Sequence, residues 1–565
     1  MGYVAPEQIV IRRNRLERAQ KLAAAEERLF AGQTQRQVGA ELGVARSTLQ
    51  DWQRAGPPNP VALAAFVATP EGVRWLHRTV LAAQFAITLR GGAGVRVVCE
   101  FLELSGLSAF VGASYGSQQA LNAALEAAVV AVAEEQRTAL AEGMAPRQVT
   151  VCEDETFHPK ICLVALEPVS NFILLERYAE DRSAATWTQA LDAALAGLAV
   201  EVVQGTSDEA KALRRHVETD LDAHHSPDLF HAQHEVSKAT SLHLARQVKQ
   251  AGEAVAVARA HWEAERAAEQ AYRRQFKHPR GRPPAFERRI QGALSDLVRA
   301  EAQQTRAQAR QSEARALMRE LGTLYHPYDL ESGQAQPVER VAQRFEDVWK
   351  RLQRLAEAAD LPGRARARLA KAQRLTTQLL ATIAFFFATL QAKVDALNLP
   401  PAVQTAVLEQ LIPALYLDRV AARSPGAETR QRLRELSTRL LDPLRQHDHP
   451  LQALPPAVRE QIEQVAGECA DLFQRSSSAV EGRNGQLSLY HHGRHRLGER
   501  KLAALTAVHN FYICRADATT AAERFFGRAH APLFELLINR VPLPPQPRRR
   551  RPRPPKQPYL TPVAA

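Results

Sequence analysis

The sequence predicts a mostly helical protein that contains one mixed α/β domain. Strand-like alternation of apolar and polar side chains is confined to residues 146–240, whereas residues 235–470 hold long runs rich in Ala, Arg, Glu and Gln and nothing strand-like. Helical patterns also fill the chain before residue 140. With 565 residues, the chain is long enough for several domains and a sizeable core.

The composition is basic, with 73 Lys and Arg against 61 Asp and Glu and a formal net charge of +12. This balance favours a polyanionic partner, because Lys and Arg that meet phosphates release counterions. The alternative is a merely soluble basic protein. The five cysteines form no CxxC pair, so neither a zinc knuckle nor a disulfide framework is predicted, and a reducing cytosol fits.

No membrane association is expected. The N-terminus is charged early, at Glu7, Arg12 and Arg13, which is unlike a signal peptide. The most apolar stretch, residues 375–394, contains several polar side chains and is predicted to be a buried helix rather than a membrane span. We therefore expect a cytoplasmic protein.

Residues 1–58 predict a helix-turn-helix domain. Residues 35–42 form the supporting helix, Gly43 and Val44 the turn, and residues 45–54 the recognition helix, with a small core of Val38, Leu42, Val44, Leu49 and Trp52. Several polar side chains of the second helix remain free to face a DNA major groove: Arg46, Ser47, Thr48, Gln50 and Arg54. A plain helical bundle is the alternative.

Residues 59–145 predict a second helical region, with breaks at residues 91–94 and 105–107, that could also bind DNA. Residues 146–240 then predict a mixed sheet with helices packed on its faces. Its predicted elements are strands at 149–153, 161–167 and 172–178, a helix around 187–195, a strand at 200–203, a helix around 210–221 and a short extended piece at 229–231.

Residues 241–469 predict an all-helical insertion. Two helices, at 236–275 and 285–322, would each exceed about 50 Å and form an antiparallel hairpin. Its tip, Arg280-Gly281-Arg282-Pro283, is similar to an AT-hook core whose arginines enter a minor groove; an ordinary basic turn is the alternative. Residues 521–565 end in a Pro/Arg-rich tail that is predicted to be disordered.

Acidic residues follow two predicted strands. Asp154 closes the first strand between Glu153 and Glu155, and Asp208 follows the fourth. Neighbouring carboxylates repel unless cations neutralise them, and two cations about 3.5–4 Å apart can activate water and stabilise the leaving oxygen of a phosphodiester. Ordinary turn residues are the alternative reading, and strand alternation alone does not say which of the three side chains near 154 would face metals.

A third acidic position, Glu481, lies in the segment Val480-Glu481-Gly482-Arg483-Asn484-Gly485. Ser478 and Glu481 have the spacing of a capping box, so Glu481 could simply cap a helix. Histidines cluster near residues 224–234 and 491–495, but no matching Cys/His spacing favours zinc. His231 is expected to support an active site or to pack beneath it.

Taken in order, these acidic segments, together with Ser226-Pro227-Asp228-Leu229-Phe230-His231, resemble the core of bacterial insertion-sequence transposases of the DDE type. The resemblance covers residues 150–240 and 470–515. It implies a ribonuclease-H-like fold with a mixed five-stranded sheet, in which Asp154, Asp208 and Glu481 are the catalytic metal ligands. The 273 residues from Asp208 to Glu481 imply that the helical insertion interrupts this core, whose last helix lies in residues 470–520.

The resemblance further implies Mg²⁺ or Mn²⁺ as cofactor, double-stranded DNA (transposon ends and target) as partner, a homo-oligomer assembled on DNA, and association with the nucleoid. Two other functions stay open. One is a ribonuclease-H-like nuclease that cuts without joining, and the other is a DNA-binding regulator derived from a transposase.

Overall fold

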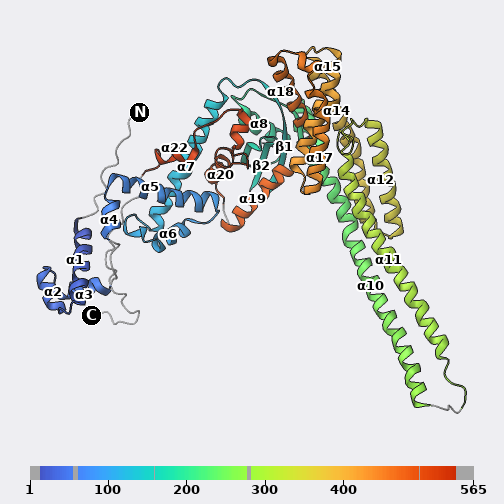
Figure 1. Cartoon of the computed structure of the whole chain (residues 1–565), viewed down its shortest axis with the longest axis horizontal. Coiled ribbons are helices and arrows are strands. Elements are labelled where there is room, and N and C mark those ends of the chain that lie inside the picture. Colours follow the sequence, from blue (N-terminus) through green and yellow to red (C-terminus); the bar gives the residue numbers. More distant parts are fainter. Residues whose placement is uncertain (1–12, 55–60, 158–159, 277–280, 495–496, 543–565) are drawn as a thin grey trace, which may run out of the picture.

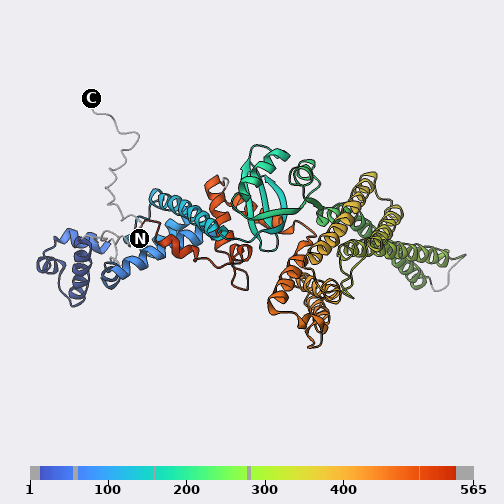
Figure 2. The same ribbon diagram turned by 90° about the horizontal axis from the view of Figure 1, so that it is seen from above.

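The computed structural model describes residues 13–54, 61–157, 160–276, 281–494 and 497–542. The molecule is elongated, with a small helical unit at one end, a sheet-containing body in the middle and a long helical hairpin projecting at the other end (Figures 1 and 2). The described chain is mostly helical and contains a five-stranded mixed sheet, which confirms this part of the predicted fold class.

The N-terminal unit consists of α1 (Arg13–Phe30), α2 (Gln35–Glu41) and α3 (Arg46–Arg54). Thr34 and Gln37 form a capping box that starts α2. Gly43 takes a positive φ of 62° in the turn before α3, a conformation that costs glycine little. Leu22, Val38 and Leu49 are fully buried in a small core, so the two helices expected at 35–42 and 45–54 are both present.

A helical layer follows and supports one face of the sheet. Its elements are α4 (Val61–Val67), α5 (Pro70–Gln84), the π-helix η1 (Phe85–Arg90), α6 (Val95–Leu104), the short η2 (Leu107–Ala109) and α7 (Tyr115–Ala141). The expected breaks at 91–94 and 105–107 separate these helices.

The sheet has strand order β3-β2-β1-β4-β5. β1 pairs antiparallel with β2 and β2 with β3, whereas β4 and β5 run parallel to β1. The strands are β1 (Arg147–Phe157), β2 (Ile161–Glu167), β3 (Phe172–Ala179), β4 (Val200–Ser207) and β5 (His224–Pro227). Helices α8 (Ala184–Leu195), α9 (Lys211–Arg215) and η3 (His216–Asp220) form the connections.

Helices cover both faces of the sheet. Trp187 and Leu191 of α8 pack on Leu163 and Leu175 of one face. The opposite face, which includes Cys152, packs against α7 and against the C-terminal helices. Because side chains alternate along β1, Asp154 shares the second face with Cys152, while Glu153 and Glu155 share the first.

One expectation for the sheet was wrong. The last strand is His224–Pro227, not residues 229–231, which form the first turn of α10. Asp228 is the reason, since its side chain accepts a hydrogen bond from the Phe230 amide (2.7 Å) and so caps the helix. The predicted fourth strand was also too short, because β4 continues to Ser207.

The described residues of the insertion form helices joined by turns, and their β-structure is limited to an isolated bridge between Tyr328 and Ala335. α10 (Leu229–Gln275) and α11 (Phe286–Leu324) form the expected antiparallel hairpin, with 47 and 39 residues and lengths of about 70 and 58 Å. The other helices are α12 (Val338–Ala358), α13 (Gly363–Arg374), α14 (Thr376–Asp395), α15 (Pro401–Ala406), η4 (Val407–Leu411), α16 (Ile412–Arg423), α17 (Ala427–Leu441), η5 (Pro443–Arg445), η6 (Pro450–Ala453) and α18 (Pro456–Leu472).

One stretch, Gly363–Asp395, is long and apolar enough to cross a membrane by length and composition. It spans α13 and α14, and the apolar face of α14, including Ile383, Phe386 and Val394, is buried in the main core of the insertion. One side of α14 is therefore packed in the core, whereas only 33% of the apolar window as a whole is buried, so the prediction of a buried helix holds for that side alone.

The chain returns to the sheet after the insertion. α19 (Ser478–Arg494), α20 (Glu499–Phe511), α21 (Ala521–Phe526) and α22 (Leu533–Ile538) follow in order. They share one hydrophobic core with residues 64–141 and with the second face of the sheet. The helical layer before the sheet and the helices at the end of the chain therefore belong to one packed body.

Candidate active site

The strand register brings three aspartates to the same edge of the sheet. Cys152 pairs with Thr206 in the parallel pair β1–β4, and Ser207 pairs with Pro227 in β4–β5. Continuing this register along the chain places Asp154, Asp208 and Asp228 side by side: Asp154 lies within β1, where β4 stops pairing with it, and Asp208 and Asp228 directly follow β4 and β5. Neighbouring strands lie about 4.8 Å apart, so the three aspartates form a row.

Asp154 is held in a defined orientation. Its Oδ1 accepts a hydrogen bond from the Glu155 amide (2.8 Å), and its Oδ2 accepts one from Nδ2 of Asn484 (2.7 Å) on α19. Burial raises the pKa of Asp154, and the negative charge of Asp208 raises it further, against the lowering effect of the two hydrogen bonds. A bound cation would relieve this crowding of negative charge.

The two glutamates beside Asp154 point to the other face of the sheet. Glu153 is fully buried, with Oε1 3.3 Å from Nε2 of the equally buried His216. Glu155 accepts a hydrogen bond from the Trp187 indole (3.2 Å) and pairs with Arg182 (3.2 Å). Asp154 is thus the one acidic residue of the three whose side chain lies on the same face as α19.

Asp208 directly follows β4 and is half-exposed. Its Oδ1 accepts a hydrogen bond from the Ala210 amide (2.9 Å), which leaves its other oxygen without a hydrogen bond in the described part of the chain. The turn fixes the carboxylate at the sheet edge.

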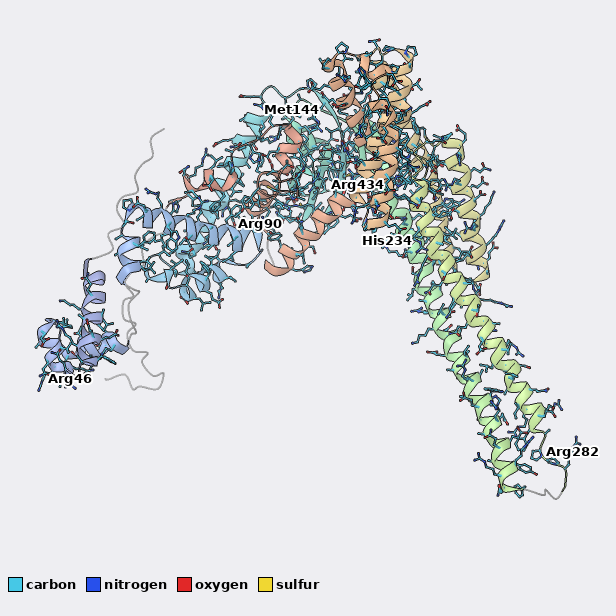
Figure 3. The ribbon with its side chains drawn as sticks, viewed as in Figure 1. Arg46, Arg90, Met144, His234, Arg282 and Arg434 are labelled. Carbon is cyan, nitrogen blue, oxygen red and sulfur yellow. The ribbon has the colours of Figure 1, made fainter. Side chains whose placement is uncertain are left out.

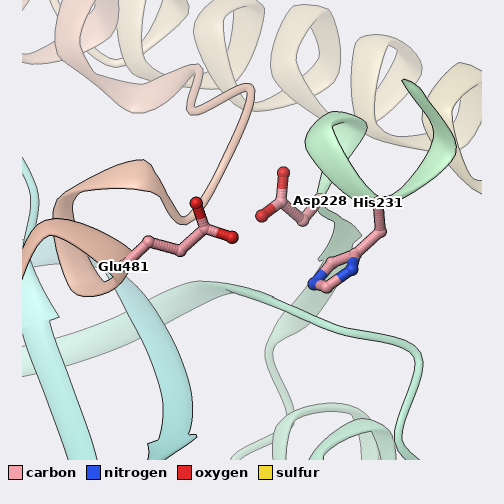
Figure 4. A group of neighbouring side chains, drawn as sticks. All are labelled: Asp228, His231 and Glu481. Atoms are coloured by element: carbon pink, nitrogen blue, oxygen red, sulfur yellow. The ribbon is translucent and has the colours of Figure 1, made fainter. Parts of the chain in front are cut away.

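Asp228, His231 and Glu481 form a compact group (Figure 4). One potential ligand atom of each side chain lies within 4.8 Å of the others. The carboxylates of Asp228 and Glu481 point toward each other, and the His231 ring lies beside them (Figure 4). The residues come from the first turn of α10 and its cap and from the first turn of α19, which are about 250 residues apart.

Asp228 also joins the two ends of the insertion. Its Oδ2 accepts hydrogen bonds from the amide (3.2 Å) and hydroxyl (2.5 Å) of Ser477, which directly precedes α19. The Leu229 amide donates to the carbonyl of Arg475 (3.1 Å) beside it. Because the helical insertion leaves and returns at one point, it interrupts the sheet domain without separating the acidic residues.

Glu481 does not cap its helix in the way that the Ser478 spacing suggested. α19 begins at Ser478, and the carboxylate of Glu481 accepts no hydrogen bond within the described residues. Burial raises the pKa of Glu481, and the charges of Asp228 and Asp154 raise it further, while His231 lowers it. A half-buried carboxylate without a donor, surrounded by other carboxylates, is suited to a cation.

A buried ion pair fixes α19 against the sheet. Arg483, 4% exposed, makes two hydrogen bonds to the fully buried Glu176 of β3 (2.7 and 2.6 Å), and Thr506 of α20 donates to the same carboxylate (2.5 Å). Bidentate charge-assisted bonds of this kind are strong and directional. They set the rotation of α19, so that Glu481 and Asn484 face the aspartates.

The donor set of the site fits a hard divalent cation. Carboxylate oxygens of Asp154, Asp208, Asp228 and Glu481, with one imidazole, surround the sheet edge. Mg²⁺ and Mn²⁺ prefer oxygen ligands. The sequence had pointed to three of these residues; Asp228 was not among the predicted ligands, and only the β4–β5 register shows that it stands beside Asp208.

The neighbouring histidines have structural roles. His225 bonds to the Ser207 hydroxyl (2.9 Å), and His224 stacks on Phe385 with ring centroids 4.4 Å apart. Burial lowers the pKa of each to about 4. Glu235, the next acid along α10, is engaged by Arg368 (3.1 Å) and Lys371 (3.3 Å).

The residues expected to read DNA lie far from this site (Figure 3). Arg46 and Ser47 are exposed on α3 and Thr48 is half-buried, whereas Gln50 donates a hydrogen bond to Gln35 (2.9 Å). Arg282 is exposed near the far end of the hairpin. The side chain of Arg54, and Arg280 as a whole, lie outside the described residues.

Comparison with known families gives one match. Residues 407–553, about a quarter of the chain, match the model of a family of unknown function (DUF6399). The matched region runs from η4 through α22 and beyond, and so contains Glu481 and Asn484 but neither the sheet nor the three aspartates. A search of curated proteins found no match.

Proposed function

We propose that this protein is a DNA transposase of the DDE type, with a ribonuclease-H-like core that cuts and joins phosphodiester bonds. The observation that supports the proposal is a gathering of carboxylates at one edge of the sheet: Asp154 and Asp208 lie at adjacent strands, and Glu481, grouped with Asp228 and His231, is close enough to Asp154 for the charge of Asp154 to raise its pKa. Three separate elements supply these carboxylates. The first and the last of them, Asp154 and Glu481, are 327 residues apart in the sequence. Structural ion pairs place opposite charges together, whereas this arrangement gathers like charges, which is costly unless a ligand compensates.

Asp154 and Asp208 would hold one Mg²⁺ or Mn²⁺ ion between them, and Glu481 would complete the shell of a second. When bound, such ions lower the pKa of water and stabilise charge on the attacking and leaving oxygens of a phosphodiester. Asp228 and His231 lie against Glu481 and would contribute a further oxygen and nitrogen ligand or accept a proton there.

The protein's own contribution is positioning. Asn484 holds Oδ2 of Asp154, and the Arg483–Glu176 pair sets the direction of Glu481. Asp228 ties the start of α10 to the start of α19, so the two halves of the site stay in register. A site held by buried bonds requires little rearrangement when the reaction begins.

DNA recognition would lie at a distance from the chemistry. The N-terminal unit presents Arg46 and Ser47 from an exposed helix, as a major-groove reader does. Its position at the end of the molecule opposite the hairpin supports a role in holding DNA ends while the central body cuts (Figure 3). A basic chain suits such a partner.

A strand-transfer assay tests this proposal. Purified protein is incubated with Mg²⁺, a supercoiled target plasmid and a labelled duplex taken from the DNA that flanks the coding region. A transposase gives labelled plasmid, in which the 3′-hydroxyl of the duplex is joined to the target. Nicks without joined product would instead support the ribonuclease-H-like nuclease, and binding without either product would support a DNA-binding regulator. The Asp208→Asn variant is the control, and joined product from that variant would contradict the assignment.

A further inference from the structure

A row of basic side chains on α10 begins close to the acidic site. Along α10, a stripe of side chains at helical spacing begins at His231 and continues through Glu235, Lys238, Leu242 and Lys249. The distance from His231 to Lys249 along the helix is about 27 Å. From His231 to Lys249, α10 contains a single acidic residue, Glu235.

Helix α13 lies beside this stripe and runs antiparallel to it. Near one end Arg368 and Lys371 contact Glu235, and near the other Gln247 donates to the carbonyl of Ala359 (2.6 Å), just before α13. The sequence of α13, GRARARLAKAQR, contains five basic residues and no acid. Its apolar positions 365, 369 and 372 are buried, which leaves the basic side chains outside.

The two helices together form a basic seam. It is defined by Lys238, Arg246 and Lys249 of α10 and by Arg364, Arg368 and Lys371 of α13, all of them exposed. Glu235 is only 16% exposed, so its charge is neutralised within the seam rather than displayed. Six basic side chains therefore line this band, which begins at Lys238, two helical turns from His231. Arg368 and Lys371 also pair with Glu235, and Lys249 lies 3.8 Å from Glu253, so the band keeps a net positive charge.

We propose that the basic seam binds the phosphate backbone of the DNA duplex next to the bond being cut, and so leads it into the acidic site. Like cations side by side repel one another and weaken the fold, and a polyanion removes that cost. The seam extends about 17 Å along α10, from Lys238 to Lys249, and so spans the phosphates of about half a turn of duplex, since each strand carries a phosphate about every 3.4 Å of axis. This inference rests on the proposed function, because it names the DNA surface of the same site.

The test measures binding without cleavage. Fluorescence anisotropy is followed for a labelled 30-base-pair duplex of arbitrary sequence, in EDTA, over a series of salt concentrations. The seam variant combines Lys238→Gln, Lys249→Gln and Arg364→Gln. The control variant removes the same charge from the exposed side of α12, by Arg340→Gln, Lys350→Gln and Arg354→Gln. Both sets consist of exposed residues and both contain one lysine with an acid four positions away.

Each lost phosphate contact lowers the slope of log K against log salt by about 0.9. The seam variant should therefore lose up to about 2.7 from the slope and at least about tenfold in affinity at 0.1 M salt, while the control stays near wild type. Equal slopes for the seam variant and wild type would overturn the inference. A loss confined to single-stranded DNA, with duplex binding intact, would overturn the choice of duplex.

The strand-transfer assay and the salt series together distinguish a wrong seam from a wrong catalytic assignment. Wild-type protein that joins DNA while the seam variant keeps its salt slope would refute the seam alone. Protein that joins nothing, but binds duplex through the seam, would refute the catalytic assignment and leave the seam as a DNA surface.

Discussion

Replacing Glu481 with Gln is expected to stabilise the metal-free protein while weakening its response to Mg²⁺. A carboxylate oxygen of Glu481 lies within 4.8 Å of Asp228, with Asp154 also close enough to raise its pKa. Two like unit charges at that distance repel by about 3.5 kcal/mol at an effective dielectric constant of 20 and by about 0.9 kcal/mol at 80. Because Glu481 is half-exposed, we expect a gain of about 1–2 kcal/mol for Glu481→Gln at pH 8.

The pH dependence of this gain has a definite sign. The pKa values of Glu481 and Asp154 are raised in the folded protein, so the folded state binds more protons than the unfolded state between the ordinary and the raised pKa. The contribution of these two carboxyl groups to metal-free stability is then greatest at acidic pH and falls as the pH rises through their raised pKa values. The advantage of Glu481→Gln should be complete at pH 8 and should shrink as the pH approaches about 4.

In Mg²⁺, wild type should become more stable than Glu481→Gln, which reverses the order expected without metal. A cation that binds only the folded protein adds about 2.7 kcal/mol at 100 times its Kd, and the variant lacks a ligand for it. Differential scanning fluorimetry in EDTA and in a MgCl₂ series measures both effects, at about 2–4 °C per kcal/mol for a unit of 150–250 residues. Glu499→Gln, at an exposed acid in the first turn of α20, is the matched control. A destabilised Glu481→Gln with an unchanged Mg²⁺ response would refute the reasoning and would show that the Glu481 carboxylate stabilises the fold without binding a cation.

Three other predictions concern separate parts of the chain. Arg46→Ala should weaken binding to the specific DNA ends by about 1–3 kcal/mol and affect random duplex less, and equal losses in a gel-shift titration would remove its base-reading role. Arg282→Ala should flatten the salt dependence of DNA binding if the hairpin tip meets phosphates; an unchanged slope would show that the tip is only a turn. Glu176→Gln should cost about 3–5 kcal/mol, since it leaves the buried charge of Arg483 without its partner, and a denaturation midpoint equal to wild type would contradict this.

Much of the fold could be predicted because it depends on local patterns. Two strand-like runs on either side of a predicted turn located β2 and β3 within one residue, and long runs of Ala, Arg, Glu and Gln located the hairpin α10–α11. The end of the sheet could not be located in this way. Residues 229–231 are apolar and aromatic and look extended, but the capping bond from Asp228 turns them into a helix.

The candidate site was less accessible to sequence reasoning, since its geometry depends on contacts between distant residues. Asp154, Asp208 and Glu481 could be named from their segments, but the side chain at 154 could not be chosen over its neighbours without knowing which face α19 covers. Asp228 required the β4–β5 register, and Asn484 required the packing of α19 that the buried Glu176 fixes. The basic seam required the pairing of helices more than 100 residues apart.

The most direct test of the central claim is Mg²⁺-dependent nicking of a supercoiled plasmid that carries the DNA flanking the coding region. Wild type and Glu499→Gln should convert the plasmid to the nicked form in Mg²⁺ and not in EDTA. Asp154→Asn and Glu481→Gln should each lose nicking by orders of magnitude while binding the same DNA, and the double variant should be little worse than either, because ligands of one metal centre act as a unit. Nicking by Glu481→Gln at the wild-type rate would contradict the account.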